Sequence, residues 1–428
     1  MRLVIQNVAR VESATIDLGG IAVLAGANGT GKSTISRSLM SISSVTRRIN
    51  SLILVERGKS IVTALQEAFK KYGGDIFYTP TSFNGNLGGW LQCLNVEWWR
   101  DESQVVSWLK EHNREDVIVF PQEFLDRPQC AMAVKEAKPK ILDAIGRSDD
   151  VYVTYICKKL FKKAFNGQLK PVFVNQVKSY IAIEDVDHPE ANVSITFNDG
   201  EVNAYTNIGR TFYPSVVYFE PLHYVDFVND LDKPVSDRYS AGSHCSCFVI
   251  KKDPPKNLSL EEQSELDDAN EITRDIISNI HGRLVNDDAD IKFNESFSDG
   301  NHLINVKNIA SGMKTMAAIV RAVENRSIRK GSLLIVDEPE SNLHPHWQVS
   351  FAAFLTAFAK RLSVSMLLNT HSPYFMQAIR VFAHESNVPC RFYDMVCRDD
   401  AFYAEDVSDR LERIFRTMSE PFNNLICA

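Results

Sequence analysis

Gly26-Ala27-Asn28-Gly29-Thr30-Gly31-Lys32-Ser33 fits the phosphate-binding loop pattern G-x-x-x-x-G-K-[ST] without a gap. The apolar run at residues 21–25 is typical of a buried parallel strand, and residues 33–40 predict the opening of a helix. Glycines at 26, 29 and 31 let backbone N–H groups turn inward, and the helix N-terminus adds partial positive charge. The sequence therefore predicts a strand, loop and helix that bind a di- or triphosphate.

Chemistry assigns roles within this loop. Lys32 is expected to reach the β- and γ-phosphates, and the Ser33 hydroxyl to ligate Mg²⁺. The remaining positions predicted to bind the nucleotide in this stretch are Gly26, Ala27, Asn28, Gly29, Thr30, Gly31 and Thr34.

Length and composition set broad limits. The 428 residues suggest two or three structural units, and 44% hydrophobic content is enough for globular cores. A net charge of −7 argues against a uniformly basic nucleic-acid coat but leaves room for a local basic face. No run approaches the roughly 18 to 20 apolar residues of a membrane span, so we expect a cytoplasmic protein with no membrane partner.

The eight cysteines are scattered, so free thiols are expected. His244-Cys245-Ser246-Cys247 resembles half of a metal site, but no second pair lies at ligand spacing. We therefore expect no zinc centre.

The middle of the chain changes pattern twice. Residues 41–170 are mainly helical in pattern, including residues 51–72, 89–112 and 138–166, with a short strand at 117–120. Four lysines there form two i, i+4 pairs, which indicate a solvated face or a contact for nucleic acid or a partner: Lys158, Lys159, Lys162 and Lys163.

Residues 171–207 then alternate with period two. The segments 192–197 and 201–205 flank Asn198-Asp199-Gly200, which predicts a hairpin, and a further strand is expected at 216–219. Residues 260–277 predict an amphipathic helix with Ser259 as N-cap and Glu262 completing a capping box.

A second strong pattern is Leu333-Leu334-Ile335-Val336-Asp337-Glu338-Pro339. Its apolar residues predict a buried strand that places two carboxylates at its C-terminal end, where α/β sheets bind ligands. Asp337 is expected to hold Mg²⁺ through water, and Glu338 to accept a proton from the attacking water. The strand predicted at 365–370 ends in His371, which is expected to sense the γ-phosphate.

These motifs resemble the ATP-binding-cassette ATPases of the RecF, SMC and OLD-like branch, especially the ATPases of bacterial antiphage-defence systems such as Septu, PARIS and some retrons. The order matches: phosphate loop, signature motif at 308–314, acidic strand, D-loop at 340–345, and switch histidine. Ser311 and Gly312 match the signature Leu-Ser-Gly-Gly-Gln, whereas Met313 and Lys314 depart from it and resemble the defence ATPases more than transporter cassettes.

The resemblance implies an α/β fold: an ABC-type P-loop ATPase head with an antiparallel β subdomain. Residues 1–40 and 171–428 would form the ATPase domain, and residues 41–170 a helical insert that contacts a partner or ligand. The implied cofactors are ATP and Mg²⁺. The resemblance also implies a homodimer or higher oligomer in which Ser311 and Gly312 of one head complete the ATP site at Lys32 of another. A Q-loop glutamine is implied as well, at Gln122 or Gln176.

The implied function is ATP hydrolysis in the sensor or regulatory subunit of an antiphage complex, with dimerisation controlling a separate nuclease or toxin effector. Only 57 residues follow His371, and Asp399-Asp400 is too little for the clustered metal ligands of an OLD nuclease. Two alternatives stay open: a RecF-like repair ATPase that binds duplex DNA, and a nucleotide-gated scaffold that hydrolyses little ATP and holds a toxin silent.

Overall fold

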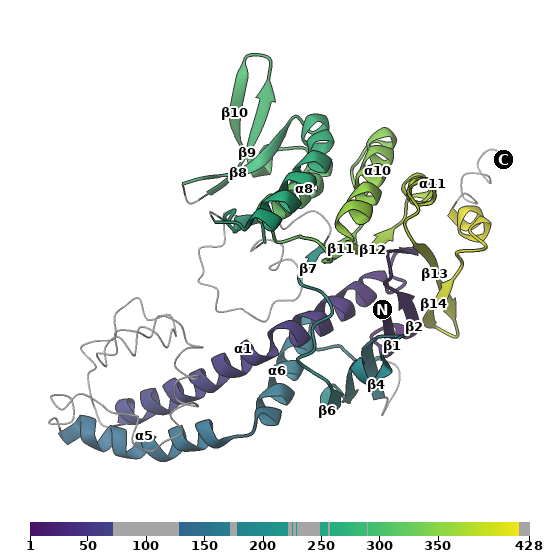
Figure 1. Ribbon diagram of the computed structural model, residues 1–428. Coiled ribbons are helices and arrows are strands. Elements are labelled where there is room, and N and C mark those ends of the chain that lie inside the picture. Colours follow the sequence, from purple (N-terminus) through teal and green to yellow (C-terminus); the bar gives the residue numbers. More distant parts are fainter. Residues whose placement is uncertain are drawn as a thin grey trace. The chain divides into compact units, whose positions relative to one another are not determined.

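The computed structural model describes residues 1–71, 128–171, 178–220, 225, 228, 249–255, 257–288 and 290–418 (Figure 1). The chain divides into two compact units. The first comprises Met1–Arg47, Leu160–Asp232 and Tyr239–Ala428, and the second comprises Arg48–Lys159 and Lys233–Arg238.

An eleven-stranded sheet forms the centre of the first unit, in the order β6-β5-β4-β1-β2-β14-β13-β3-β12-β11-β7. Strands β13, β3, β12, β11 and β7 run parallel to one another, whereas β6, β5, β4, β1 and β2 pair antiparallel. Their bounds are β1 Arg2–Val8, β2 Val11–Asp17, β3 Ile21–Ala25, β4 Lys178–Glu184, β5 Val193–Asn198, β6 Glu201–Thr206, β7 Val216–Phe219, β11 Leu333–Asp337, β12 Ser365–Thr370, β13 Cys390–Arg398 and β14 Ala401–Asp406.

This strand order positions the functional residues. Strand β12 lies between β3 and β11, with Thr370 opposite Ala25 and Asn369 opposite Asp337. Because the carboxyl ends of parallel strands meet at one edge of a sheet, the loops after β3, β11 and β12 leave the sheet side by side.

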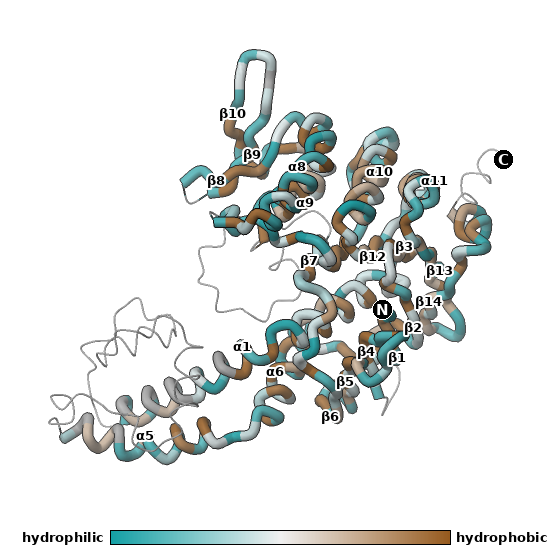
Figure 2. The backbone as a smooth tube through the Cα atoms, in the orientation of Figure 1, coloured by the Kyte–Doolittle hydropathy of each residue, from teal (hydrophilic) through white to brown (hydrophobic). Residues whose placement is uncertain are grey.

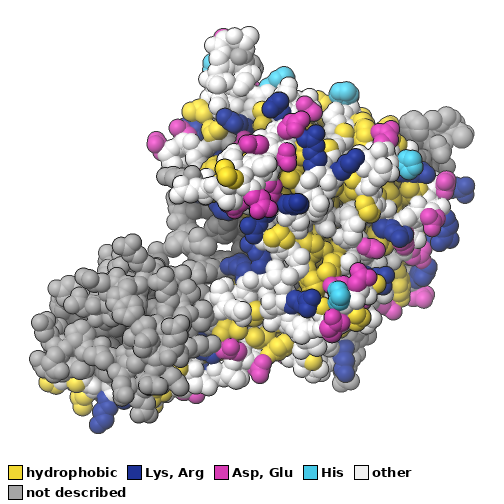
Figure 3. All heavy atoms as spheres, in the orientation of Figure 1, with side chains coloured by type: hydrophobic (Ala, Val, Ile, Leu, Met, Phe, Trp, Pro, Cys, Tyr) yellow, Lys and Arg dark blue, Asp and Glu magenta, His cyan; other side chains and the backbone are white. Residues whose placement is uncertain are grey.

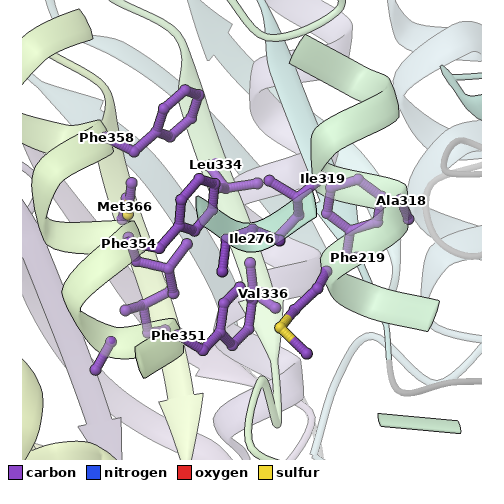
Figure 4. Close-up of a cluster of buried hydrophobic side chains, with 14 of the residues drawn as sticks. Phe219, Ile276, Ala318, Ile319, Leu334, Val336, Phe351, Phe354, Phe358 and Met366 are labelled. Carbon is purple, nitrogen blue, oxygen red and sulfur yellow. The ribbon is translucent and has the colours of Figure 1, made fainter. Parts of the chain in front are cut away.

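A hydrophobic core joins the parallel strands to the helices α8 (Leu260–Asn279), α9 (Ser311–Glu324), α10 (Pro345–Leu362) and α11 (Pro373–Ser386). Strands β3, β11 and β12 are buried almost throughout, and Figure 2 shows hydrophobic stretches there. Phe351, Phe354 and Phe358 of α10 lie with Leu334, Val336 and Met366 in Figure 4. Burying each such phenylalanine contributes about 1.5–3 kcal/mol, so these contacts stabilise the packing of α10 on β11 and β12.

A separate antiparallel sheet has the order β10-β9-β8, formed by β8 (Gly282–Asp287), β9 (Asp290–Phe297) and β10 (Gly300–Asn305). Leu284, Ile291 and Phe293 are buried in the same core as the helices. The hairpin of β9 and β10 projects beyond this core, with Leu303 53% exposed (Figure 1).

The predicted α/β P-loop fold with antiparallel strands is confirmed. Strand β7 has the predicted bounds, and β5 and β6 form the predicted hairpin. Helix α8 begins with the predicted capping box, in which Ser259 Oγ accepts the Glu262 N–H at 3.2 Å and Glu262 Oε2 accepts the Ser259 N–H at 3.0 Å.

Two helix boundaries differ from prediction. The helix predicted to open at 33–40 and the helical segment predicted at 51–72 form one helix, α1, over Lys32–Lys71. The segment 138–166, predicted as helix, covers the end of α5 (Pro128–Gly146) and all of α6 (Asp149–Ala164). Asp149 and Asp150 in the first turn of α6 favour a new helix start there, because carboxylates stabilise a helix N-terminus. The elements expected at 89–112 and 117–120 lie outside the described residues.

The four lysines of α6 are not all simply exposed to solvent. Lys159 Nζ lies 3.5 Å from Glu56 Oε1, and the Glu56 side chain is only 8% exposed. Lys159 therefore has a structural partner, and the division into ATPase domain and partner-binding insert stays a prediction.

The described surface mixes charges of both signs. Figure 3 shows basic and acidic side chains interspersed over the face it presents. Among the described residues, none of the helices combines the length and apolar content needed to cross a membrane.

Candidate nucleotide-binding site

The phosphate loop connects β3 to α1, and two of its glycines have no room for a side chain. Gly31 has φ +96°, and a Cβ there would lie 2.7 Å from Val11 Cγ2. Gly26 has φ +147°, and its Cβ would lie 2.9 Å from Met395 Cβ. Side chains of β2 and β13 therefore leave no space for a Cβ at these positions, and the positive φ angles also favour glycine there.

A cavity of about 300 Å³ opens in front of this loop. It brings together nine predicted residues: Asn28, Gly29, Gly31, Lys32, Ser33, Thr34, Asp337, Glu338 and His371. Three residues that the sequence did not suggest also line it: Arg10, Arg37 and Asn369. Arg37 lies one helical turn after Ser33, and this spacing is a signal that could have identified it.

Lys32 is held within the loop itself. Its Nζ donates to the carbonyl oxygens of Gly26 and Ala27, each at 2.8 Å. Burial lowers the pKa of Lys32 to about 8, and the nearby Glu338, Asp337 and Glu340 carboxylates oppose this shift. The ammonium is thus poorly hydrated, which favours its interaction with a phosphate.

Asp337 ends β11 as a fully bonded, buried carboxylate. Its Oδ1 accepts hydrogen bonds from Ser36 Oγ at 2.8 Å and from Asn369 Nδ2, and its Oδ2 accepts from Tyr218 OH at 2.9 Å. Burial raises the pKa of Asp337, and hydrogen bonds from Ser33, Ser36 and Tyr218 oppose the rise.

The Asp337 and Ser33 oxygens fit Mg²⁺, which prefers one or two protein oxygens together with phosphate oxygens and water. No group of three or more His, Cys, Asp or Glu side chains in the described part of the chain forms a metal cage. A bound Mg²⁺ would therefore depend on the nucleotide for most of its ligands.

Glu338 follows Asp337 with φ +51°, a strained left-handed conformation for a glutamate. Its N–H donates to the Asn369 carbonyl at 2.8 Å, and its Oε2 accepts from Ser341 Oγ at 2.9 Å. The His371 ring links it to the phosphate loop, with Nε2 3.1 Å from Glu338 Oε1 and Nδ1 2.9 Å from the Gly26 oxygen. Both residues are therefore aimed at the cavity from adjacent strands.

Ser311 and Gly312 lie apart from these residues. They begin α9, where Ser311 is exposed and neither residue is among those that line the cavity. Gly312 instead abuts the turn at 340–345, where an added Cβ would lie 2.5 Å from the Asn342 oxygen. Their predicted contact with ATP stays a prediction. Gln122, Gln176 and residues 244–247 lie outside the described residues.

Comparison with known proteins agrees with an ATP-binding domain. Residues 251–377 match the family model described as "AAA domain, putative AbiEii toxin, Type IV TA system". The matched segment contains Ser311, Asp337, Glu338 and His371, whereas the phosphate loop lies outside it.

A 72-residue stretch is 36% identical to the lipoprotein-releasing system ATP-binding protein LolD of Neorickettsia sennetsu (strain ATCC VR-367 / Miyayama). It covers 17% of this chain and 30% of that relative's length. Similar solved structures include the SmcHead bound to the C-winged helix domain of ScpA (TM-score 0.39, 11% identity, 96% of this chain and 98% of that chain) and the SMC head domain from Thermotoga maritima (TM-score 0.35, 10% identity, 95% and 98%).

Proposed function

We propose that this protein binds ATP with Mg²⁺ and hydrolyses it to ADP and phosphate. One observation carries the proposal: a single cavity joins Lys32 of the phosphate loop to Asp337, Glu338 and His371 from two neighbouring strands. The match of residues 251–377 to an AAA family model supports it independently.

In this mechanism the loop N–H groups and Lys32 bind the β- and γ-phosphates, and Asp337 with Ser33 would hold Mg²⁺. Bound Mg²⁺ supplies charge neutralisation on the phosphate oxygens. Glu338 accepts the proton of the attacking water, and Ser341 and His371 fix its carboxylate by hydrogen bonds. His371 also contacts Gly26, so the base and the phosphate loop are held at a fixed separation.

Glu338→Gln tests this proposal. The amide keeps the size of the side chain but cannot accept the water proton, so turnover should fall about 100- to 1000-fold while ATP binding persists. Phosphate release and calorimetric ATP binding are the measurements, with Glu385→Gln on the exposed end of α11 as control. An unchanged rate would remove Glu338 from the mechanism, and absence of turnover in the unmodified protein and its complexes would favour the scaffold alternative.

We further propose that ATP-driven pairing of two heads controls a separate toxin or nuclease effector in an antiphage-defence complex. The toxin-linked description of the matching family model supports this role. Residues 41–170 are the proposed partner contact, because their described part is helical and inserted between β3 and the remaining strands of the sheet.

Phage challenge of the native host tests the biological role. Cells with the Glu338→Gln protein should lose protection, and affinity purification should recover an effector protein with the chain. Equal phage sensitivity with and without the intact protein would refute the defence role. Recovery of duplex DNA whose binding weakens steeply with salt would favour the RecF-like alternative.

A further inference from the structure

Glu340 is a nearly buried carboxylate that binds the loop carrying His371. It is 8% exposed, and its Oε1 accepts the backbone N–H of His371 at 2.6 Å and of Ser372 at 3.2 Å. Both donors belong to the loop that connects β12 to α11. Hydrogen bonds to a charged acceptor are stronger than neutral ones, so this single oxygen is a main anchor of that loop.

The other contacts that hold Ser372 come from β12, α10 and α11, and its N–H is shared between Glu340 and Thr370 Oγ1, the latter at 3.0 Å. Ser372 Oγ donates to Gln348 Oε1 at 2.5 Å and accepts the Phe375 N–H at 3.2 Å as the N-cap of α11. These bonds fix Ser372, whereas the only hydrogen bond recorded for the His371 backbone N–H in the described residues is the one to Glu340. The ring of His371 then reaches Gly26 and Glu338.

The second carboxylate oxygen of Glu340 makes no contact that would explain why a carboxylate stands at this position. Oε2 is buried and has no hydrogen-bond partner among the described residues. Burying a charged group with one oxygen unsatisfied costs stability, and such costs gather at functional sites. Glutamate here is therefore better explained by what Oε1 holds than by the fold.

Glu340 also begins the turn that supports the signature helix. Its carbonyl accepts the Leu343 N–H at 3.0 Å, and Asn342 within this turn has φ +58°. The Asn342 oxygen lies where a side chain of Gly312 would be, directly beside Ser311. The Glu340 side chain thus binds the loop between β12 and α11, and its backbone carbonyl is part of the turn that packs against the start of α9.

We propose that Glu340 is a positioning residue that holds the His371 backbone so that the ring spans Gly26 and Glu338. Glu340 does not line the nucleotide cavity, so it acts through His371 and not on the reacting atoms. The positioning itself is a property of the folded chain, and only its kinetic consequence rests on the proposed ATPase function.

Two substitutions separate the effect of the length of the Glu340 side chain from the effect of its charge. Glu340→Gln keeps an acceptor oxygen at the same distance without charge, whereas Glu340→Asp keeps the charge but shortens the side chain by one methylene. Without nucleotide, hydrogen exchange of the peptide containing His371 and Ser372, measured by mass spectrometry, should be about tenfold faster in Glu340→Asp, whose carboxylate is withdrawn from both N–H groups. It should be only about two- to threefold faster in Glu340→Gln, which keeps the acceptor oxygen in place but loses the charge. Glu385→Asp on the exposed end of α11 is the matched control and should change nothing.

A double-mutant cycle then tests whether Glu340 acts through His371. Glu340→Asp should lower kcat about 10- to 100-fold with ATP affinity within about twofold, and should lower it no further once His371→Ala is present. Full protection of the peptide in Glu340→Asp, or independent losses in the double mutant, would overturn the positioning role. If the unmodified protein shows no turnover, the exchange measurement still decides the proposal while the ATPase assignment fails separately.

Discussion

Lys32 illustrates how burial prepares a single side chain for phosphate. In the structure its ammonium donates hydrogen bonds to two carbonyls of its own loop. Lys32→Ala removes this cation, so ATP affinity should fall about 10- to 100-fold. Calorimetry with Lys360→Ala, an exposed lysine of α10, as control measures the change. Equal affinity of Lys32→Ala and the unmodified protein would refute the phosphate-loop assignment.

The second prediction at the residue scale concerns the reactivity of the described cysteine thiols. Burial raises the pKa of Cys157 and of Cys390 to about 12, whereas Cys397 is exposed. Because only the thiolate reacts, a thiol whose pKa lies about four units above pH 8 is about 10⁻⁴ ionised there. Iodoacetamide at pH 8 should therefore label Cys397 and spare the other two until the protein is unfolded. Mass spectrometry would contradict this if native Cys390 reacted as fast as Cys397.

At the scale of elements, the contact between α9 and the turn at 340–345 has a specific requirement. An alanine at position 312 would place Cβ 2.5 Å from the Asn342 oxygen and 2.7 Å from Leu343 Cδ2. Gly312→Ala should therefore lower the free energy of unfolding by about 1–3 kcal/mol. Gly146→Ala is the control, since an added Cβ there meets nothing within 4 Å. If denaturant titration gave both variants the same midpoint, the turn at 340–345 would have moved to accommodate the methyl group without lowering the free energy of unfolding.

The elements that the sequence predicted well are those with strong local patterns. Strand β11 is an uninterrupted apolar run, and α8 carries a complete capping box. Strands β8, β9 and β10 were not predicted, because residues 282–305 mix Asp, Asn and Lys with few apolar side chains. Their buried Leu284, Ile291 and Phe293 pack against helices distant in sequence, and that packing stabilises the sheet.

At the scale of the whole molecule, the cavity of one chain joins the phosphate loop to Glu338 and His371, the proposed catalytic residues, and Ser311 is not among its lining residues. The predicted contact of Ser311 with ATP then requires a second copy, so we expect two copies to pair head to tail. Mixed dimers of Lys32→Ala and Ser311→Arg protomers place both defects in one site and leave the other intact, so they should recover part of the turnover. Phosphate release measures the recovered turnover, and a crosslinking assay measures how many of the dimers are mixed. No recovery in dimers shown to be mixed would mean that the sites are strictly coupled or not shared.

The sequence by itself determined the phosphate loop, the acidic strand and the histidine that follows a third strand. Each depends on residues within about ten positions, so glycine placement and apolar runs are sufficient signals. Only the tertiary structure decided which side chains meet. Strand β12, between β3 and β11, brings Asn369 to Asp337 and His371 to Gly26, and β7 adds Tyr218. The role of Glu340 likewise emerged only there, because its partners lie 31 and 32 residues away and their approach depends on strand order, which no local pattern specifies.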